Sequence, residues 1–418
     1  MAQSAPSTTR SPGSAPTSTG TRQPARLLRA RQDDTPTPVT RIELFFDLVF
    51  VFAVTQLTTS LAGNFTWMGG AHITVLIISV WWLWTSTAWA TNLLDPAAAP
   101  VRALLITMMF GCLLLSACIP VAFGSRGLAF AIAFVSIQVG RTLFVLWAVR
   151  RDGQDDQHTS RTYRRILVQA IAAGVLWVAG GFADTDLRLP LWALAVGVEF
   201  LAPVSGWWVP GRGRVHVSTW DVDGGHLAER MGLFVIIALG ESVLATGATF
   251  AALAQGTAVI VAFGSAFASS VAMWVIYFQT GTYWAEQTLE RSRDVGRIAR
   301  SAYTYFHVPI VAGIVVTAVS DELVLSHPVE HPSVPTIVSS LLGPGLFLLG
   351  TLGFKWATTT RTPWVHVAGI GGLLLLVPLA PLVTGLTLGI ASTTVLIVVA
   401  GWEVLATTRA DASGDIIE

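Results

Sequence analysis

The sequence predicts an all-α, polytopic membrane protein, and three observations carry the prediction. Hydrophobic residues make up 53% of the 418 residues and charged residues only 12%, against roughly 25% in ordinary soluble domains. The mean hydropathy is +0.62. Apolar runs long enough to cross about 30 Å of hydrocarbon recur along the whole chain. With so few charges, the chain lacks the polar shell of a soluble protein. We therefore expect the lipid bilayer as its environment and no nucleic acid as its partner.

Twelve apolar runs are long enough to be membrane-spanning helices. Three of them, 166–183, 189–208 and 335–354, contain a Gly, a Pro or a charged residue that could end the helix early. In chain order the predicted spans are 43–62, 71–91, 103–122, 128–148, 166–183, 189–208, 230–249, 257–280, 302–320, 335–354, 363–382 and 387–405.

The distribution of basic residues supports this count and predicts an orientation. With the N-terminus inside the cell, 22 of the 25 Lys and Arg residues fall in cytoplasmic segments. Arg126 and Arg188 fall in external segments, and Arg141 falls within a span. Since the cytoplasmic loops of membrane proteins carry an excess of Lys and Arg, we expect both termini in the cytoplasm.

The segments outside the spans predict tails and a linker. Residues 1–40 are rich in Ser, Thr, Pro and Arg and contain no apolar core before a cleavage site, so they predict a disordered cytoplasmic tail and not a signal peptide. Residues 209–228 predict a cytoplasmic linker between two six-helix units, 41–208 and 229–405. Residues 406–418 predict a second cytoplasmic tail.

The two six-helix units resemble each other in sequence. Matching features recur at offsets of 186, 192 and 198 residues. The pairs are Glu43-Leu-Phe-Phe-Asp47 with Glu229-Arg-Met-Gly-Leu233, Trp81-Trp82-Leu-Trp84 with Met273-Trp274-Val-Ile-Tyr277, and Arg102 with Arg300. Because six is an even number, both units enter the membrane from the same side, and they predict parallel repeats about an axis along the membrane normal. Chance similarity between apolar helices is the alternative.

Two signatures in these spans resemble the bacterial low temperature requirement protein A (LtrA) family. They are Arg41-Ile-Glu43-Leu-Phe-Phe46-Asp47-Leu-Val-Phe50-Val-Phe-Ala and Glu229-Arg230-Met-Gly232-Leu-Phe-Val-Ile-Ile-Ala-Leu-Gly240-Glu241-Ser242, and the Trp-rich second span joins them. The resemblance runs from about residue 38 to 405. It implies a multi-pass protein of the bacterial plasma membrane but no particular substrate or mechanism.

A shorter resemblance lies in the first span. Arg41, Phe45, Asp47, Phe50 and Thr55 have the R-x3-F-x-D-x2-F-x4-T spacing of the TMEM175-type potassium channels, which also use six-helix units. The chain departs from that family in two places. Position 46 is Phe where that family usually has Ser, and the seventh span has Leu233 at the place equivalent to Asp47.

Ionisable residues inside spans are costly, so each is a candidate for function. Glu241 falls near the midplane of the seventh span, where a carboxyl that gains and loses a proton suits proton coupling or cation binding. Arg230 lies eleven residues earlier and about 20° away around the helix, so both side chains face one seam. Alternatively, Arg141 or a backbone group satisfies Glu241, which then has only a structural role.

Asp47 is the second candidate for solute or ion binding. Its alternative role is a structural latch between helices, with Arg41 and the arginines of neighbouring loops as expected partners. Glu43 and Glu229 stand at the N-termini of their helices, where acids complement the helix dipole. We therefore interpret Glu43 and Glu229, together with Arg230, as structural residues.

Three further residues complete the predicted binding site. Glu199 in the sixth span and Arg141 in the fourth lie at comparable depth, so they predict either a static ion pair or part of a solute pathway. His307 could relay protons, although a hydrogen bond to a neighbouring backbone carbonyl is its simpler interpretation. Four tryptophans of the second span could stack on an organic cation, or could serve in helix packing or an interfacial aromatic belt: Trp81, Trp82, Trp84 and Trp89.

One apparent metal motif is set aside. The segment His327-Pro-Val-Glu330-His331 matches the H-x-x-E-H pattern of some zinc enzymes, but Pro328 and Pro332 prevent the helix that this pattern requires. We expect no metal site there. The sequence also contains no P-loop, dinucleotide fingerprint or nucleophile elbow, so we expect no cofactor and no catalytic residues.

Buried carboxylates in duplicated halves favour a secondary transporter of a small solute or ion, with its site at the repeat interface. Two alternatives stay open. One is a cation channel of duplicated six-helix units. The other is an intramembrane enzyme or a structural membrane protein. The sequence assigns no oligomeric state.

Overall fold

The computed structural model describes most of the helical part of the chain. The described residues are 26–29, 37–152, 157–211, 213–215, 223–254, 256–279, 300–359 and 363–413. Most of the predicted tail 1–40, part of the predicted linker 209–228 and the end of the predicted tail 406–418 lie outside these ranges.

The described residues form twelve α-helices, which confirms the predicted all-α fold class. The first six are α1 (Arg41–Gly63), α2 (Trp67–Leu93), α3 (Ala99–Ser116), α4 (Gly127–Arg151), α5 (Gln157–Phe182) and α6 (Thr185–Leu201). The next six are α7 (Gly224–Ala252), α8 (Thr257–Phe278), α11 (His307–Ser326), α12 (Val334–Thr359), α13 (Trp364–Leu376) and α14 (Gly385–Ser413). Short turns η1 (Ile119–Val121), η3 (Arg300–Tyr305) and η4 (Ala380–Leu382) adjoin α3, α11 and α13.

Ten of these helices are long and apolar enough to cross a membrane, and α6 and α13 are shorter. The predicted spans 103–122, 189–208 and 363–382 are each too long at their C-terminal ends. Pro120, Pro203 and Pro378 explain the early ends, because proline disfavours helical geometry in the residue before it. In contrast, α12 continues through Pro344. Membrane helices tolerate an internal proline when neighbouring groups bond the carbonyl that it leaves free.

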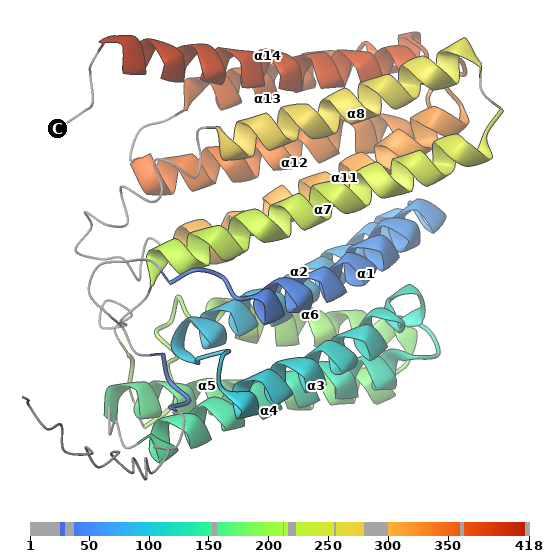
Figure 1. The fold of residues 1–418 in the computed structure, drawn as a ribbon. Coiled ribbons are helices and arrows are strands. Elements are labelled where there is room, and N and C mark those ends of the chain that lie inside the picture. Colours follow the sequence, from blue (N-terminus) through green and yellow to red (C-terminus); the bar gives the residue numbers. More distant parts are fainter. Residues whose placement is uncertain are drawn as a thin grey trace, which may run out of the picture.

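The helices of each six-helix unit lie together, with α1 and α2 beside α7 and α11 where the units meet (Figure 1). Counted from its first helix, each unit contains the same neighbouring pairs: first with second, first with third, second with sixth, third with fourth, fourth with fifth, and fifth with sixth. This pattern is what a duplicated unit requires. The repeat itself stays a prediction.

A short stretch of the predicted disordered tail packs on the helices. Leu27 and Leu28 are buried, and their backbone N–H groups donate to one carboxylate oxygen of Asp152 at the end of α4, at 2.6 and 2.9 Å. Leu28 also pairs with Leu94 in an isolated β-bridge. The prediction of disorder over the whole of 1–40 is therefore wrong for this stretch, because two adjacent leucines provide an apolar contact that composition alone does not reveal.

Exposed tryptophans gather at one set of helix ends. Of the seven exposed tryptophans among the described residues, only Trp67 lies at the opposite ends. The other six are Trp147, Trp208, Trp274, Trp356, Trp364 and Trp402, near the ends of α4, α6, α8, α12 and α14 and at the start of α13. These six side chains form an aromatic band at this end of the helices, as tryptophans at a membrane–water interface do.

Candidate functional site

The first buried polar cluster joins the two six-helix units. Arg230 on α7 donates from Nε and Nη2 to the two carboxylate oxygens of Asp47 on α1, at 2.9 and 2.5 Å. Its Nη1 donates to Glu43 at 3.1 Å and to Thr91 at 3.0 Å. All three charged side chains are completely buried. This two-point contact between guanidinium and carboxylate is the strongest geometry available to such a pair.

Further donors saturate the same two carboxylates. Trp84 Nε1 on α2 donates to Asp47 at 2.7 Å. Arg29, from the docked N-terminal stretch, donates to both oxygens of Glu43 at 3.1 and 3.2 Å, and His226 Nε2 lies 3.0 Å from Glu43. Two guanidiniums thus face two carboxylates, with the His226 imidazole beside them. We name the cluster of Arg29, Glu43, Asp47, His226 and Arg230 the inter-unit ion cluster.

The prediction of which residue pairs with Asp47 was wrong. Asp47 contacts Arg230, from the start of the second unit, instead of Arg41 or a loop arginine. Glu43 also takes part in a capping box at the start of α1, because it accepts from the backbone N–H of Thr40 at 2.9 Å. Glu229 accepts from the backbone N–H of Val39 at 3.1 Å. The cluster therefore has the contacts of a latch between units, as one of the two interpretations of Asp47 expects.

Asp223 caps α7 beside this cluster. Its carboxylate accepts from the backbone N–H of His226 at 2.9 Å and from that of Thr37 at 3.0 Å. The Asn92 amide group bonds both the N–H and the carbonyl of Asp223. Partial burial opposes ionisation of Asp223, but these donors outweigh it and hold its pKa below the usual range. The start of α7 is thus fixed to the end of α2.

Glu241 lies about 16 Å further along α7 than Arg230. It is 4% exposed, and it has the Thr55 side chain of α1 as a hydrogen-bonding neighbour. Its other oxygen, Oε2, is buried without a hydrogen-bond partner. Glu241 and Arg230 therefore both face α1, as their spacing indicates. Among the described residues, no ion pair joins Glu241 to Arg141.

Arg141 and Glu199 meet through a glutamine. Gln138, one turn before Arg141 on α4, accepts from Arg141 Nη2 at 2.5 Å and donates to Glu199 on α6 at 3.0 Å. The second oxygen of Glu199 accepts from Trp177 Nε1 at 3.2 Å. Arg141 Nη1 reaches Thr87 on α2 at 3.2 Å. The predicted direct ion pair is therefore replaced by a relay of three side chains.

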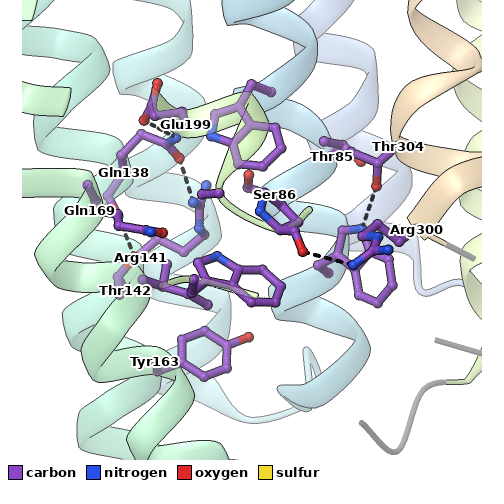
Figure 2. Close-up of a pocket in the computed structure, with 17 residues that line it drawn as sticks. Thr85, Ser86, Gln138, Arg141, Thr142, Tyr163, Gln169, Glu199, Arg300 and Thr304 are labelled. Atoms are coloured by element: carbon purple, nitrogen blue, oxygen red, sulfur yellow. Dashed lines mark hydrogen bonds between the residues drawn. The ribbon is translucent and has the colours of Figure 1, made fainter. Parts of the chain in front are cut away.

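This relay forms one wall of a cavity of about 80 Å³. The cavity is lined by α2, α4, α5, the end of α6 with the loop after it, and η3 of the second unit. Arg141 lies on one side and Arg300 on the other, with Ser86 of α2 between them (Figure 2). A water molecule needs roughly 10–15 Å³ of such space, so the cavity can hold a small solute.

The cavity lies toward the same helix ends as the aromatic band. Its lining residues come from the first half of α5, the second half of α2 and the end of α6, and those of α4 lie near the middle of that helix. Trp82, Trp89 and Trp207 supply aromatic walls, and Trp89 Nε1 donates to the Thr304 hydroxyl at 3.2 Å. Both six-helix units thus contribute to the lining.

His307 lies apart from this cavity. Its Nδ1 is 2.8 Å from the Ala302 carbonyl and its Nε2 is 2.7 Å from the Tyr277 hydroxyl. Trp81 stacks on the imidazole, with ring centroids 5.9 Å apart. The contact with a backbone carbonyl is the simpler of the two arrangements expected from the sequence. The five predicted binding residues therefore occupy four separate places, and only Arg141 and Glu199 share one.

Several buried polar residues were missed by the sequence reasoning. Lys355 of α12 pairs with Glu403 of α14, and His366 Nδ1 lies 3.4 Å from Glu403. Asp321 of α11 has one buried carboxylate oxygen without a hydrogen-bond partner. The sequence analysis placed Arg300 only at the start of a helix and did not identify it as a binding residue. Lys355 is the one lysine in the sequence, a signal that could have drawn attention to it.

The H-x-x-E-H segment has no helical geometry. His327 lies beyond the end of α11, and its Nδ1 is 3.4 Å from Glu330 with both side chains more than 60% exposed. Within the described ranges, no group of three or more His, Cys, Asp or Glu side chains is arranged to hold a metal ion.

Comparison with known proteins agrees with the resemblance seen in the sequence. Residues 38–401 match the family model described as bacterial low temperature requirement A protein (LtrA). The uncharacterized protein RA0937 of Rhizobium meliloti (strain 1021) is 40% identical over 366 residues, which cover 87% of this chain and 88% of that protein. No solved structure matches. The chain is therefore a multi-pass membrane protein that belongs to the bacterial low temperature requirement A family.

Proposed function

We propose that this protein is a secondary transporter of a small solute, which binds in the cavity between α2, α4, α5, α6 and η3. The observation that carries the proposal is the cavity itself. It combines two guanidiniums, Arg141 and Arg300, with a carboxylate, Glu199, inside a helix bundle. Ionisable groups within a membrane protein mark solute or ion pathways when they face a cavity.

The position of the cavity suits a transporter. Arg300 and Thr304 reach it from the second six-helix unit, and the other lining residues belong to the first. Trp81 and Trp89 of α2 donate to the Thr304 carbonyl and hydroxyl, at 2.7 and 3.2 Å. A rocking motion of one unit against the other would break these contacts and reshape the cavity. Such motion of repeats around a fixed site is a common form of alternating access.

The proposal includes the parallel duplication of the six-helix units. The helix pairs that touch within each unit support it, as does a shared arrangement of buried charges. The fourth and sixth helices of the first unit carry Arg141 and Glu199, and those of the second carry Lys355 and Glu403. A base on the fourth helix thus stands near an acid on the sixth helix in both units.

We place the cavity on the cytoplasmic side, with both termini in the cytoplasm. The excess of basic residues in the segments at these helix ends supports this orientation. The aromatic band marks the same membrane surface. In this arrangement the inter-unit ion cluster is a latch near the cytoplasmic surface. Glu241, with its unpartnered oxygen, is the candidate for binding a coupling cation or proton.

Reconstitution into proteoliposomes tests the proposal. With a panel of radiolabelled small solutes, we expect uptake of at least one that saturates with concentration. Replacing Glu199 with Gln should alter that uptake by at least tenfold, because this residue lines the cavity. The matched control is Glu322→Gln, a change in a carboxylate outside the cavity lining. Ohmic current without saturation would instead establish the channel, and absence of both fluxes would overturn the proposal.

A further inference from the structure

We propose that the solute of this cavity is a small organic anion, a monocarboxylate with a compact apolar body. This inference deepens the proposed function and rests on it for transport, but the binding that it requires can be measured separately. Three features of the cavity carry it: an uncompensated positive charge, donors available to an anion, and aromatic walls.

The cavity carries more positive than negative charge. Arg141 and Arg300 both line it, whereas Glu199 is its only acidic lining residue among the described residues. No ion pair within 4 Å is formed by either arginine in the described ranges. Even with Glu199 ionised, the described lining residues carry one more positive charge than negative charges. A charge away from bulk water is costly unless an opposite charge pairs with it, so the cavity favours an anion.

Arg300 supplies the donors. A guanidinium has five N–H donors in a planar fork. The Nη1 of Arg300 donates to the Pro203 carbonyl at 2.8 Å, which fixes the orientation of the side chain. Its Nε is buried and has no hydrogen-bond partner. An incoming carboxylate would provide both the acceptor and the charge that this group lacks.

Glu199 does not provide that charge to Arg300. Its two oxygens accept from Gln138 and Trp177, at 3.0 and 3.2 Å. Gln138 in turn accepts a hydrogen bond from Arg141. The carboxylate of Glu199, the amide of Gln138 and the guanidinium of Arg141 are therefore bonded in sequence along one wall. Figure 2 shows Arg300 on the opposite side of the cavity. The relay orients Arg141, and Arg300 is left as the primary anion contact.

The rest of the lining selects an apolar body. Trp82, Trp89, Trp207 and Tyr163 contribute aromatic rings. Binding sites for small organic molecules combine such walls with a few placed polar groups. The volume of about 80 Å³ limits the solute to a compact body. A hydrated inorganic anion would gain nothing from the aromatic walls, and an organic cation would be repelled by Arg141 and Arg300.

The test uses three molecules of one shape and different charge on the full-length protein purified in detergent. Benzoate is the anion, benzamide its neutral counterpart and benzylamine the cation. Isothermal titration should detect binding of benzoate and at least tenfold weaker binding of the other two. Equal binding of benzoate and benzamide, or preference for benzylamine, would overturn the inference. Chloride and acetate at the same concentrations test for an inorganic or small-anion site, and equal competition by chloride would also overturn it.

Two arginine variants locate the site. Arg300→Gln should weaken benzoate binding by about 10- to 100-fold, the effect of losing a charged hydrogen bond. Arg300→Lys, which keeps the charge, should recover part of the affinity. Arg102→Gln changes an exposed arginine of α3 outside the cavity and should have no effect. An Arg300→Gln variant that folds and binds benzoate normally would contradict the assignment.

The outcome separates this inference from the proposed function. Benzoate binding without saturable uptake of any solute would support the anion site and contradict transport. Saturable uptake of cations or neutral solutes, without benzoate binding, would support transport and overturn the anion assignment.

Discussion

At the scale of single residues, the inter-unit ion cluster shows how this protein accommodates charges away from water. Arg230, Asp47 and Glu43 are completely buried, yet each meets charged or polar partners at hydrogen-bond distance. Removing one member of a buried ion pair costs about 3–5 kcal/mol, because it leaves the other charge without compensation. The cluster therefore contributes to stability chiefly through its completeness.

A double variant tests this account. Arg230→Gln and Asp47→Asn should each lower the unfolding free energy by about 3 kcal/mol. The double variant should lower the unfolding free energy by less than the sum of the two single losses, because neither charge is left without its partner. Thermal unfolding in detergent measures the difference, with Arg102→Gln as the exposed arginine control. Strictly additive losses would contradict a direct coupling between Asp47 and Arg230.

The partners of these residues could not be predicted from sequence. Asp47 and Arg230 are 183 positions apart, and helix periodicity gives the face of each side chain but not the helix opposite that face. Periodicity did predict that Arg230 and Glu241 face one seam. It could not show that Gln138 connects Arg141 with Glu199, because an uncharged amide inside a span is less costly than a charge and is therefore a weaker indication of function. The cavity depends on such pairings and was not predicted.

At the scale of helices, length and composition predicted the twelve described helices, of which ten are long and apolar enough to cross a membrane, because each helix must satisfy its own backbone in lipid. The errors are in the predicted helix ends, because a following proline ends three of the helices earlier than predicted. Glycine adds a second kind of information in α11 and α12. A Cβ on Gly313 would lie 2.5 Å from the Phe347 backbone nitrogen, and one on Gly350 would lie 2.7 Å from that of Ile310. Small residues permit this close approach of membrane helices.

The packing of α11 on α12 predicts a clear effect of a single methyl group. Gly313→Ala should destabilise the protein by about 1–3 kcal/mol, because the new Cβ has no space beside α12. Gly371→Ala in α13 is the matched control, since no atom lies within 4 Å of a Cβ there. It should be neutral or slightly stabilising. Equal unfolding temperatures for the two variants in detergent would contradict the packing described.

At the scale of the whole molecule, the two six-helix units meet along α1, α2, α7 and α11 (Figure 1). The inter-unit ion cluster joins them near the starts of α1 and α7. The contacts of Trp81 and Trp89 with Thr304 join them beside the cavity. Charge distribution in the sequence predicts which helix ends face the cytoplasm, and this orientation stays a prediction. The charge distribution carries no information on which helices enclose a solute. That property depends on how the units pack.

The central claim is that a solute site inside the bundle opens to the cytoplasm. In a background with the two buried cysteines replaced, Ser86→Cys places a thiol on the cavity wall. Ser79→Cys is the control, because Ser79 is buried on the same helix outside the cavity lining. A membrane-impermeant thiol reagent added to inside-out vesicles should label Cys at position 86 and spare position 79, and benzoate should slow the labelling. Failure to label position 86 from the cytoplasmic side, or equal labelling of both positions, would contradict the claim.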